Sequence, residues 1–149
     1  MGRTASRPPP YDPGMPTVRW DRARALATID PLDVDDLDGR TLVVDGITRT
    51  DDARLDWVRR APCVVIGTTP DGDEPSSVVD VTLPATSAGD TLDDLLDRID
   101  ANPHAARVLV DVLRAMPELD VPTGLTIESL AYSALLAGPE FGGHASRFR

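Results

Sequence analysis

The chain has 149 residues and a formal net charge of −10, with 25 Asp and Glu side chains against 15 basic ones, all of them Arg. This length corresponds to one domain that can bury a core of its own. The acidic balance argues against nucleic acid as a partner, because phosphate binding needs clustered positive charge. The lack of Lys excludes Schiff-base chemistry and a phosphate-loop lysine.

The N-terminal residues 1–16 are rich in Pro and hold no apolar run of the length that a secretory signal needs. We expect them to form a disordered leader. A single cysteine, Cys63, leaves no pair for a disulfide, which is typical of a cytoplasmic protein. No stretch approaches the roughly 20 apolar residues that span a bilayer. We therefore expect no membrane and no nucleic acid among the partners.

The first half of the chain predicts a short helix followed by strands. Apolar side chains recur at roughly helical spacing over 17–29, and an acidic connector occupies 30–39. The runs 41–47 (TLVVDGI) and 63–68 (CVVIGT) predict two buried strands, and the amphipathic segment between them, with Thr50 as its cap, predicts a helix. These elements form one βαβ unit. A more alternating run, 78–83 (VVDVTL), predicts a third strand nearer an edge.

The second half has helical spacing from Asp90 onward. Asn102 and Pro103 are typical first residues of a helix, and Pro122 opens a last helix that ends at Ala137. The buried stripe of the middle helix would consist of Val108, Leu109, Val112, Leu113 and Met116.

The sequence thus predicts an α/β fold with a small, mostly parallel three-stranded sheet that contains a βαβ unit, followed by a C-terminal helical segment of about three helices. Residues 17–141 would form a single domain, and residues 142–149 a flexible tail.

The last predicted helix carries apolar side chains around nearly its whole circumference, and Glu128 is its only charge. A helix at the end of a small domain normally keeps one polar face. Either this domain wraps the helix, or a partner covers it. The residues predicted for such an interface are Leu130, Tyr132, Leu135, Leu136 and Phe141.

Motifs for cofactor or metal binding are incomplete. Gly67 and Gly72 have the spacing of a phosphate loop, but Asp73 and Glu74 stand where Lys and Ser or Thr are required. The acidic connector fails the calcium-loop pattern after its third position. The two histidines lie far apart in the sequence and lack zinc-ligand spacing, although His104 stays open as a general base. We therefore predict no cofactor and no metal.

Polar residues within the strands are the remaining candidates for a site. Asp45 and Asp80 interrupt apolar strands, and Asp45, followed by Gly46, stands at the carboxyl end of its strand, where open α/β sheets bind ligands. A hydrogen-bonded turn carboxylate is the simpler explanation of Asp45. Cys63 is best explained as a small buried hydrophobe. Ser129 and Ser133 share a helix face, but no base lies at a spacing that would indicate a catalytic triad.

The run 101–141, ANPHAARVLVDVLRAMPELDVPTGLTIESLAYSALLAGPEF, resembles a region that precedes the crotonase-fold domain in some actinobacterial proteins of the enoyl-CoA hydratase/isomerase family. The stretch 124–141 is the most specific part, and residues 41–84 fit more loosely. Crotonase catalysis uses two backbone N–H groups that polarise an acyl-CoA thioester carbonyl, while carboxylates move protons. The segments that supply these groups belong to the catalytic domain, which is absent here. The resemblance implies an acyl-CoA context and a partner, but no catalytic residue in this chain.

Two functions are therefore expected. The first is a non-catalytic accessory domain that docks through its apolar last helix onto a crotonase-family catalytic subunit or a second copy of itself. The alternative is an independent small-molecule-binding protein or enzyme that uses the strand ends near Asp45, Gly46 and Gly67. A third expectation is a truncated reading frame that ends where the catalytic domain of a larger protein would begin. A crotonase sequence directly downstream in the genome would support this expectation.

Overall fold

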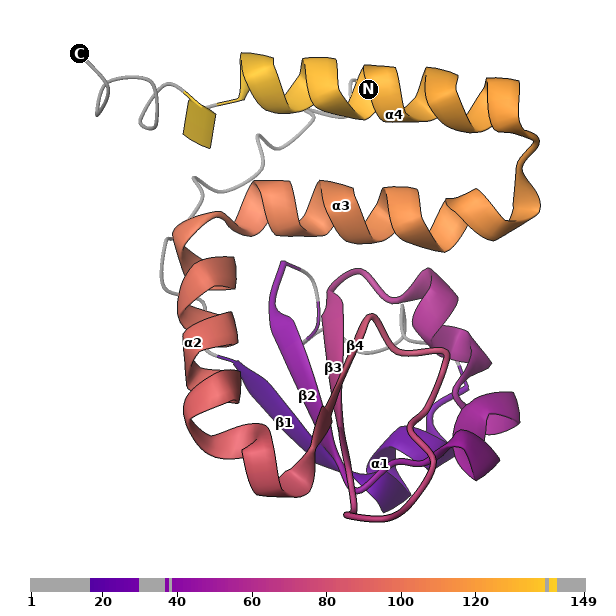
Figure 1. Cartoon of the computed structure of the whole chain (residues 1–149), viewed down its shortest axis with the longest axis vertical. Helices are drawn as coiled ribbons and strands as arrows, with labels where there is room; N and C mark the ends of the chain where they lie inside the picture. Colours follow the sequence, from indigo (N-terminus) through magenta and orange to yellow (C-terminus); the bar gives the residue numbers. More distant parts are fainter. Residues whose placement is uncertain (1–16, 30–36, 38, 139, 142–149) are drawn as a thin grey trace, which may run out of the picture.

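Four parallel strands form one sheet in the computed structural model, which describes residues 17–29, 37, 39–138 and 140–141. The strands are β1 (Val18–Asp21), β2 (Thr41–Asp45), β3 (Val64–Thr69) and β4 (Val81–Pro84), and they pair in the order β1-β2-β3-β4 (Figure 1). The predicted α/β fold with a parallel sheet and C-terminal helices is confirmed. The predicted number of three strands is wrong, because β1 adds a fourth.

β1 lies where the sequence predicted the start of a helix. Residues 17–29 divide into β1 and the short helix α1 (Arg22–Ala27), which Asp21 caps by accepting a hydrogen bond from the Arg24 N–H at 2.8 Å. Trp20 points into the core from the strand, and Ala25 does so from the helix. Both elements bury apolar side chains on the same face of the sheet. The spacing of these residues in the sequence therefore resembles the apolar stripe of a single amphipathic helix.

All three connections between successive strands cover the same face of the sheet. They are α1 with Leu37, the 3-10 helices η2 (Arg49–Arg54) and η3 (Asp56–Arg60), and the β3–β4 connector, and all of them pack into one core. The predicted α-helix between β2 and β3 is therefore two 3-10 helices, and the first begins after Thr48 rather than Thr50. The core residues on this face are Trp20, Ala25, Leu37, Leu42, Val44, Ile47, Leu55, Trp57, Val58, Ala61, Cys63 and Val65.

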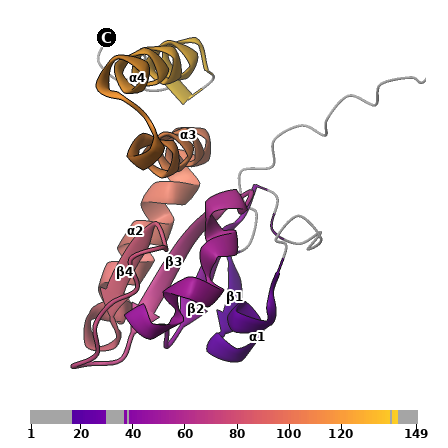
Figure 2. The same ribbon diagram turned by 90° about the vertical axis from the view of Figure 1, so that its right-hand side faces the viewer.

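Helices α2 (Ala88–Ala101) and α3 (Pro103–Ala115) cover the opposite face, after the short 3-10 turn η4 (Ala85–Ser87). Their core consists of Val43, Val64, Ile66, Leu92, Ile99 and Val110. The 3-10 turn η5 (Met116–Glu118) then leads to α4 (Val121–Ala137), which runs back along α3 on the side away from the sheet (Figures 1 and 2). We call α3, η5 and α4 the α3–α4 hairpin.

The hairpin and the carboxyl ends of the strands lie at opposite ends of the domain (Figure 1). Arg107 and Arg114 of α3 donate to the carbonyl of Ala61, which comes shortly before β3 begins, so α3 crosses near the amino ends of the strands. The predicted leader, the tail and most of the predicted connector fall outside the described residues. None of the helices in the described part of the chain has the length and apolar character that crossing a bilayer requires.

Candidate functional site

Helix α4 packs against the rest of the domain along one narrow face. Of its 17 residues only Gly124 is fully buried. The least exposed positions recur at intervals of three or four residues, which places them on the side facing α3. A Cβ at Gly124 would approach the Met116 sulfur to 3.1 Å, so the missing side chain lets the two helices come close. The inner face of α4 consists of Gly124, Ile127, Ala131 and Leu135.

Both ends of the α3–α4 hairpin are fixed by carboxylates. Asp120 caps α4 by accepting a hydrogen bond from the Thr123 N–H at 2.8 Å, and the bonds from Thr123 lower the pKa of the Asp120 carboxyl. At the other end, Glu140 accepts hydrogen bonds from the N–H groups of His104 and Ala105, at 2.7 and 3.0 Å. A carboxylate from beyond α4 therefore occupies the positive end of α3 and holds the two helices together.

The residue that caps α3 is not the one that the sequence predicts. Asn102 stands at the predicted N-cap position, but its side chain makes no capping bond and instead donates to the Arg98 carbonyl at 3.4 Å. Glu140 performs the capping from 36 residues away. The same contacts place His104 beside the end of α4, where a Cβ at Gly138 would lie 3.4 Å from its imidazole. His104 thus lies in the first turn of α3, and its backbone N–H donates to the Glu140 carboxylate.

The hairpin exposes a continuous apolar flank on the side of β4. Val110 and Arg114 of α3 face the sheet, and Leu109 and Leu113 lie about 100° around the helix from them. Leu113 lines a small cavity together with Val79 and Asp80, which fixes this flank on the β4 side. Tyr132 and Leu136 of α4, together with Phe141 beyond its end, line a second cavity with Asn102, which precedes α3, and Ala105 on the same flank of α3. We define the β4-side flank as Leu109, Leu113, Val121, Leu125, Tyr132, Leu136 and Phe141.

The predicted interface residues lie on three different sides of α4. Tyr132, Leu136 and Phe141 belong to the β4-side flank and are 64%, 40% and 45% exposed. Leu130, 66% exposed, projects from the opposite flank, and Leu135 lies on the inner face against α3. The sequence pattern alone does not separate these sides, because α4 is apolar all round.

Sequence reasoning missed the contribution of α3 to this surface. Leu109 and Leu113 were predicted to be buried, but they are 56% and 57% exposed. The prediction is wrong because α3 lies between the sheet and α4, so its buried positions form two narrow faces instead of one broad stripe. The side toward the sheet holds Val110 and Arg114.

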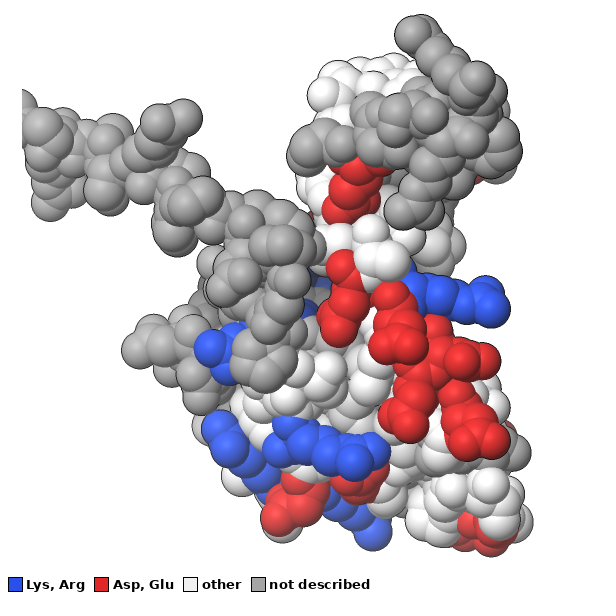
Figure 3. All heavy atoms as spheres, turned by 90° about the vertical axis from the view of Figure 1, so that its left-hand side faces the viewer, with Lys and Arg blue, Asp and Glu red and all other residues white. Residues whose placement is uncertain are grey.

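Charge is concentrated away from the β4-side flank. Figure 3 shows acidic side chains gathered along α2. The exposed carboxylates of that helix are Asp90, Asp93, Asp94, Asp97 and Asp100. The residues that define the flank are apolar apart from the Tyr132 hydroxyl, and the one charged residue of α4, Glu128, lies between Leu125 and Tyr132 on the same side of the helix. The hairpin therefore offers a mostly apolar surface with one carboxylate on a strongly acidic chain.

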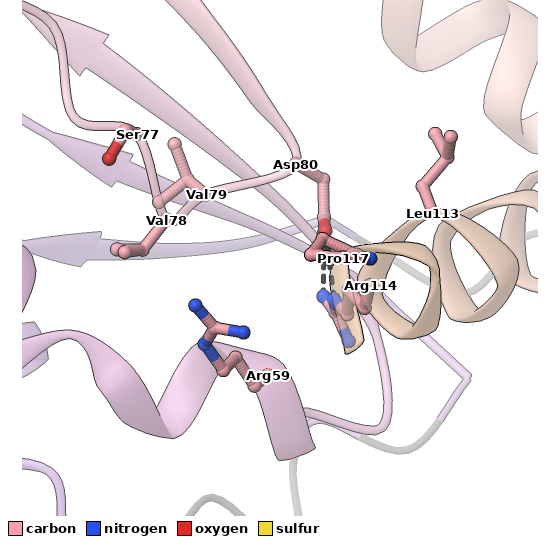
Figure 4. Close-up of a pocket in the computed structure, with 8 residues that line it drawn as sticks. All are labelled: Arg59, Ser77, Val78, Val79, Asp80, Leu113, Arg114 and Pro117. Atoms are coloured by element: carbon pink, nitrogen blue, oxygen red, sulfur yellow. Dashed lines mark hydrogen bonds and ion pairs between the residues drawn. The ribbon is translucent and has the colours of Figure 1, made fainter. Parts of the chain in front are cut away.

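Asp80 was a candidate for a polar site, and the structure places it in a buried ion pair with Arg114. The guanidinium donates from Nε to Oδ1 at 2.8 Å and from Nη2 to Oδ2 at 2.5 Å (Figure 4). The neighbouring cavity measures about 190 Å³, below the roughly 300 Å³ at which small-molecule pockets begin. Since Nη1 donates to the Ala61 carbonyl and Nη2 donates also to the Cys63 carbonyl, all three guanidinium nitrogens of Arg114 are used within the fold.

Asp45, the preferred candidate at the strand ends, is bonded to its neighbours. Its Oδ1 accepts a hydrogen bond from the Thr68 hydroxyl at 3.1 Å, and its Oδ2 lies 3.5 Å from Nε of Arg19. Gly46 follows with φ of +75°, a left-handed conformation that favours glycine, and its N–H donates to the Thr68 hydroxyl. These contacts describe a turn that joins the ends of β2 and β3.

Core side chains, and not an open space for a ligand, lie next to Gly67. An added Cβ would lie 2.5 Å from Cδ1 of Ile47 and 3.1 Å from Cγ2 of Val79. The described strand order β1-β2-β3-β4 also contains no reversal, so these strands form no topological switch point of the kind at which open α/β sheets bind ligands.

Two cavities nevertheless lie near the carboxyl ends of the strands. One, of about 290 Å³, is lined by residues that include Thr69, Pro70 and Pro84. The other, of about 490 Å³, contains the two cations Arg22 and Arg49. Both guanidinium groups are paired, Arg22 with Asp51 at 2.7 Å and Arg49 with Glu74 at 3.3 Å. An anionic ligand in this cavity would have to compete with those carboxylates.

Cys63 and Ser133 are not activated as nucleophiles, in line with the absence of any predicted catalytic residue. Burial raises the pKa of the Cys63 thiol to about 12, although Arg114 and Arg107 act in the opposite direction. Ser133 donates its hydroxyl to the Ser129 carbonyl one turn earlier in α4. Within the described residues, no group of three His, Cys, Asp or Glu side chains is placed to hold a metal ion.

Comparisons with known proteins give this chain no relative. No family model matches the sequence, no curated protein matches it, and no solved structure matches the fold.

Proposed function

We propose that this chain is a non-catalytic interaction domain that docks through the α3–α4 hairpin. The observation that carries the proposal is α4 itself, a helix of 17 residues that is apolar around nearly its whole circumference and buries one residue fully. A single amphipathic helix in water normally turns its apolar side to a core. Here the core-facing side is narrow, and large side chains such as Leu125 and Tyr132 remain more than 60% exposed. Contiguous apolar surface of this kind marks contact sites.

The rigidity of the hairpin supports the same function. Glu140 ties the end of α4 to the first turn of α3, Asp120 caps the first turn of α4, and the Arg114–Asp80 pair fixes α3 on the sheet. A preformed surface loses little conformational entropy on binding, which favours affinity. The side chains that could carry chemistry, Asp45 and Cys63 among them, are occupied by contacts inside the fold or buried.

The crotonase context belongs to this proposal through the sequence resemblance. The resembling run, 101–141, includes α3 and α4, so the segment that resembles a crotonase-associated region is the segment that bears the exposed flank. A crotonase-family catalytic subunit, acting on acyl-CoA, is therefore one partner class for the hairpin. A second copy of the chain is the other.

Site-specific photocrosslinking tests whether the hairpin is a docking surface. Benzoyl-phenylalanine would be placed at Leu125 in the full chain, with Thr91 on the exposed side of α2 as the matched control position. The purified protein would be irradiated alone and with crotonase-family catalytic subunits from its own organism. We expect crosslinked products from position 125 and none from position 91. Equal yields from the two positions, or no product from either, would overturn the proposal.

A second candidate function is small-molecule binding at the carboxyl ends of the strands, favoured by the cavity of about 490 Å³ that Arg22 and Arg49 line. Its volume lies within the ordinary range of ligand pockets, roughly 300–1,000 Å³. A thermal-shift screen with CoA esters, nucleotides and sugar phosphates tests it. A rise in melting temperature that Arg49→Ala abolishes would favour this function, and no shift with any of these compounds would remove it.

A further inference from the structure

We propose that the β4-side flank of the hairpin binds the same flank of a second copy of this chain, related to the first by a twofold axis. This inference rests on the proposed function, because it names the partner of the same surface. The antiparallel helices α3 and α4 of one copy would meet those of the other to form a four-helix arrangement.

The size of the flank fits a dimer. Its seven side chains are between 40% and 75% exposed. If each offers on the order of 150 Å² when fully exposed, the flank presents roughly 600 Å² of side-chain surface, nearly all of it apolar. A stable interface buries about 800 Å² on each partner, of which about two-thirds is apolar in homodimers. The apolar part of a homodimer interface is therefore already present on the described hairpin.

The spacing of the side chains on α4 fits helix pairing. Val121, Leu125, Tyr132 and Leu136 follow one another at intervals of four, seven and four residues, and Glu128 occupies the position of the same row between Leu125 and Tyr132. Apolar positions at such intervals form a row along a helix, as in coiled coils and helix bundles. Leu109 and Leu113, one turn apart on α3, extend the row sideways, so the surface is two helices wide.

The charge distribution favours a second copy over a partner selected by charge. Two copies of a chain with a net charge of −10 repel each other, so they associate most readily through a surface with few carboxylates. The β4-side flank carries one carboxylate, Glu128, whereas the five aspartates of α2 lie outside the flank (Figure 3). A basic partner would gain little from a flank with a single carboxylate. Homodimer interfaces are also the class richest in apolar residues.

Sedimentation equilibrium of the full chain from about 1 to 100 µM tests the inference. We expect a mass of twice the 16.0 kDa of one chain. Leu125→Glu and Tyr132→Glu should each weaken dimerisation by on the order of 100-fold, because each replaces an apolar contact and places a further charge beside Glu128 in the interface. Leu130→Glu is the matched control, since it adds the same charge to the opposite flank of the same helix, and it should leave the dimer intact. Circular dichroism of each variant verifies that α4 still folds.

Each outcome decides between the two proposals. A wild-type monomer at 100 µM overturns the inference. If crosslinks to a crotonase-family subunit still form through position 125, the proposed docking function remains and only the partner is wrong. A monomer without such crosslinks removes both. A dimer that Leu130→Glu dissociates and Leu125→Glu does not would overturn the assignment to the β4-side flank.

Discussion

Arg114 and Asp80 form a bidentate ion pair that ties α3 to the strand connection before β4. The two side chains are 11% and 7% exposed. Asp80 also satisfies the backbone near the start of β3, because its N–H donates to the Val65 carbonyl and its Oδ2 accepts from the Val65 N–H at 2.7 Å. The guanidinium in turn satisfies the carbonyls of Ala61 and Cys63. One pair of side chains thus joins the hairpin, the start of β3 and the connector.

Arg114→Ala is expected to lower the free energy of unfolding by about 3–5 kcal/mol, because it leaves the Asp80 carboxylate buried without its cation. Urea denaturation at pH 7 measures the change. Arg98→Ala, on the exposed side of α2, should alter stability by less than about 0.5 kcal/mol. The double variant Asp80→Leu with Arg114→Leu should lose less than the sum of its two single variants, since it removes both charges together. A loss below about 1 kcal/mol for Arg114→Ala would contradict the structural role given to the pair.

Gly67→Ala tests whether the end of β3 is filled by the core. The new methyl would lie 2.5 Å from Cδ1 of Ile47, a fully buried side chain, so we expect a loss of about 1–3 kcal/mol in unfolding free energy. Gly89→Ala is the control, because nothing lies within 4 Å of its added Cβ and the position is inside α2. It should stabilise the protein by about 0.5–1 kcal/mol. Adding Ile47→Val should recover part of the loss in Gly67→Ala. Unchanged stability of Gly67→Ala would mean that the space is open, as a ligand cradle requires.

Acid should destabilise the protein through Asp51 and Asp52. Burial opposes the ionisation of Asp51, but hydrogen bonds from Arg22 and from the Thr48 N–H outweigh it and lower the pKa of that carboxyl. Bonds from Ser77 and Ser76 lower the pKa of Asp52 in the same way, again against the effect of burial. A carboxyl with a lowered pKa in the folded state binds its proton more readily after unfolding. Its contribution to stability is therefore complete above its unfolded pKa, near 4, and is lost as the pH falls through the folded value.

The measurement is the free energy of unfolding between pH 7 and pH 2. We expect it to fall below about pH 4 and to fall less steeply in Asp51→Asn, which is already destabilised at pH 7. Asp94→Asn on the exposed side of α2 should keep the wild-type stability at pH 7. If Asp51→Asn and the wild type show the same slope in acid, Asp51 is not the group responsible.

The sequence predicted the elements whose determinants are local. β2 and β3 are apolar runs bounded by turn residues, and α2 and α4 begin and end close to their predicted positions. β1 was missed because Arg19 and Asp21 interrupt a strand of only four residues at the edge of the sheet. The exposure of Leu109 and the capping by Glu140 depend on where α4 lies against α3, and no pattern within either helix contains that information. The apolar character of the candidate surface was therefore predictable, whereas its division into two flanks was not.

Glu140→Ala should loosen the α3–α4 hairpin, because it removes the acceptor for the N–H groups of His104 and Ala105. We expect a loss of about 0.5–2 kcal/mol in unfolding free energy, as for other helix caps, and Glu140→Gln should lose less because it retains one acceptor oxygen. Glu128→Ala is the matched control, since it removes an exposed carboxylate from the middle of α4. Hydrogen exchange gives the specific readout: the amides of His104 and Ala105 should exchange faster in Glu140→Ala and at the wild-type rate in Glu128→Ala. A preformed hairpin also implies that Glu140→Ala weakens any association through the β4-side flank, since the helices must then be ordered on binding. Unchanged exchange at both amides would show that the first turn of α3 is held by something other than this carboxylate.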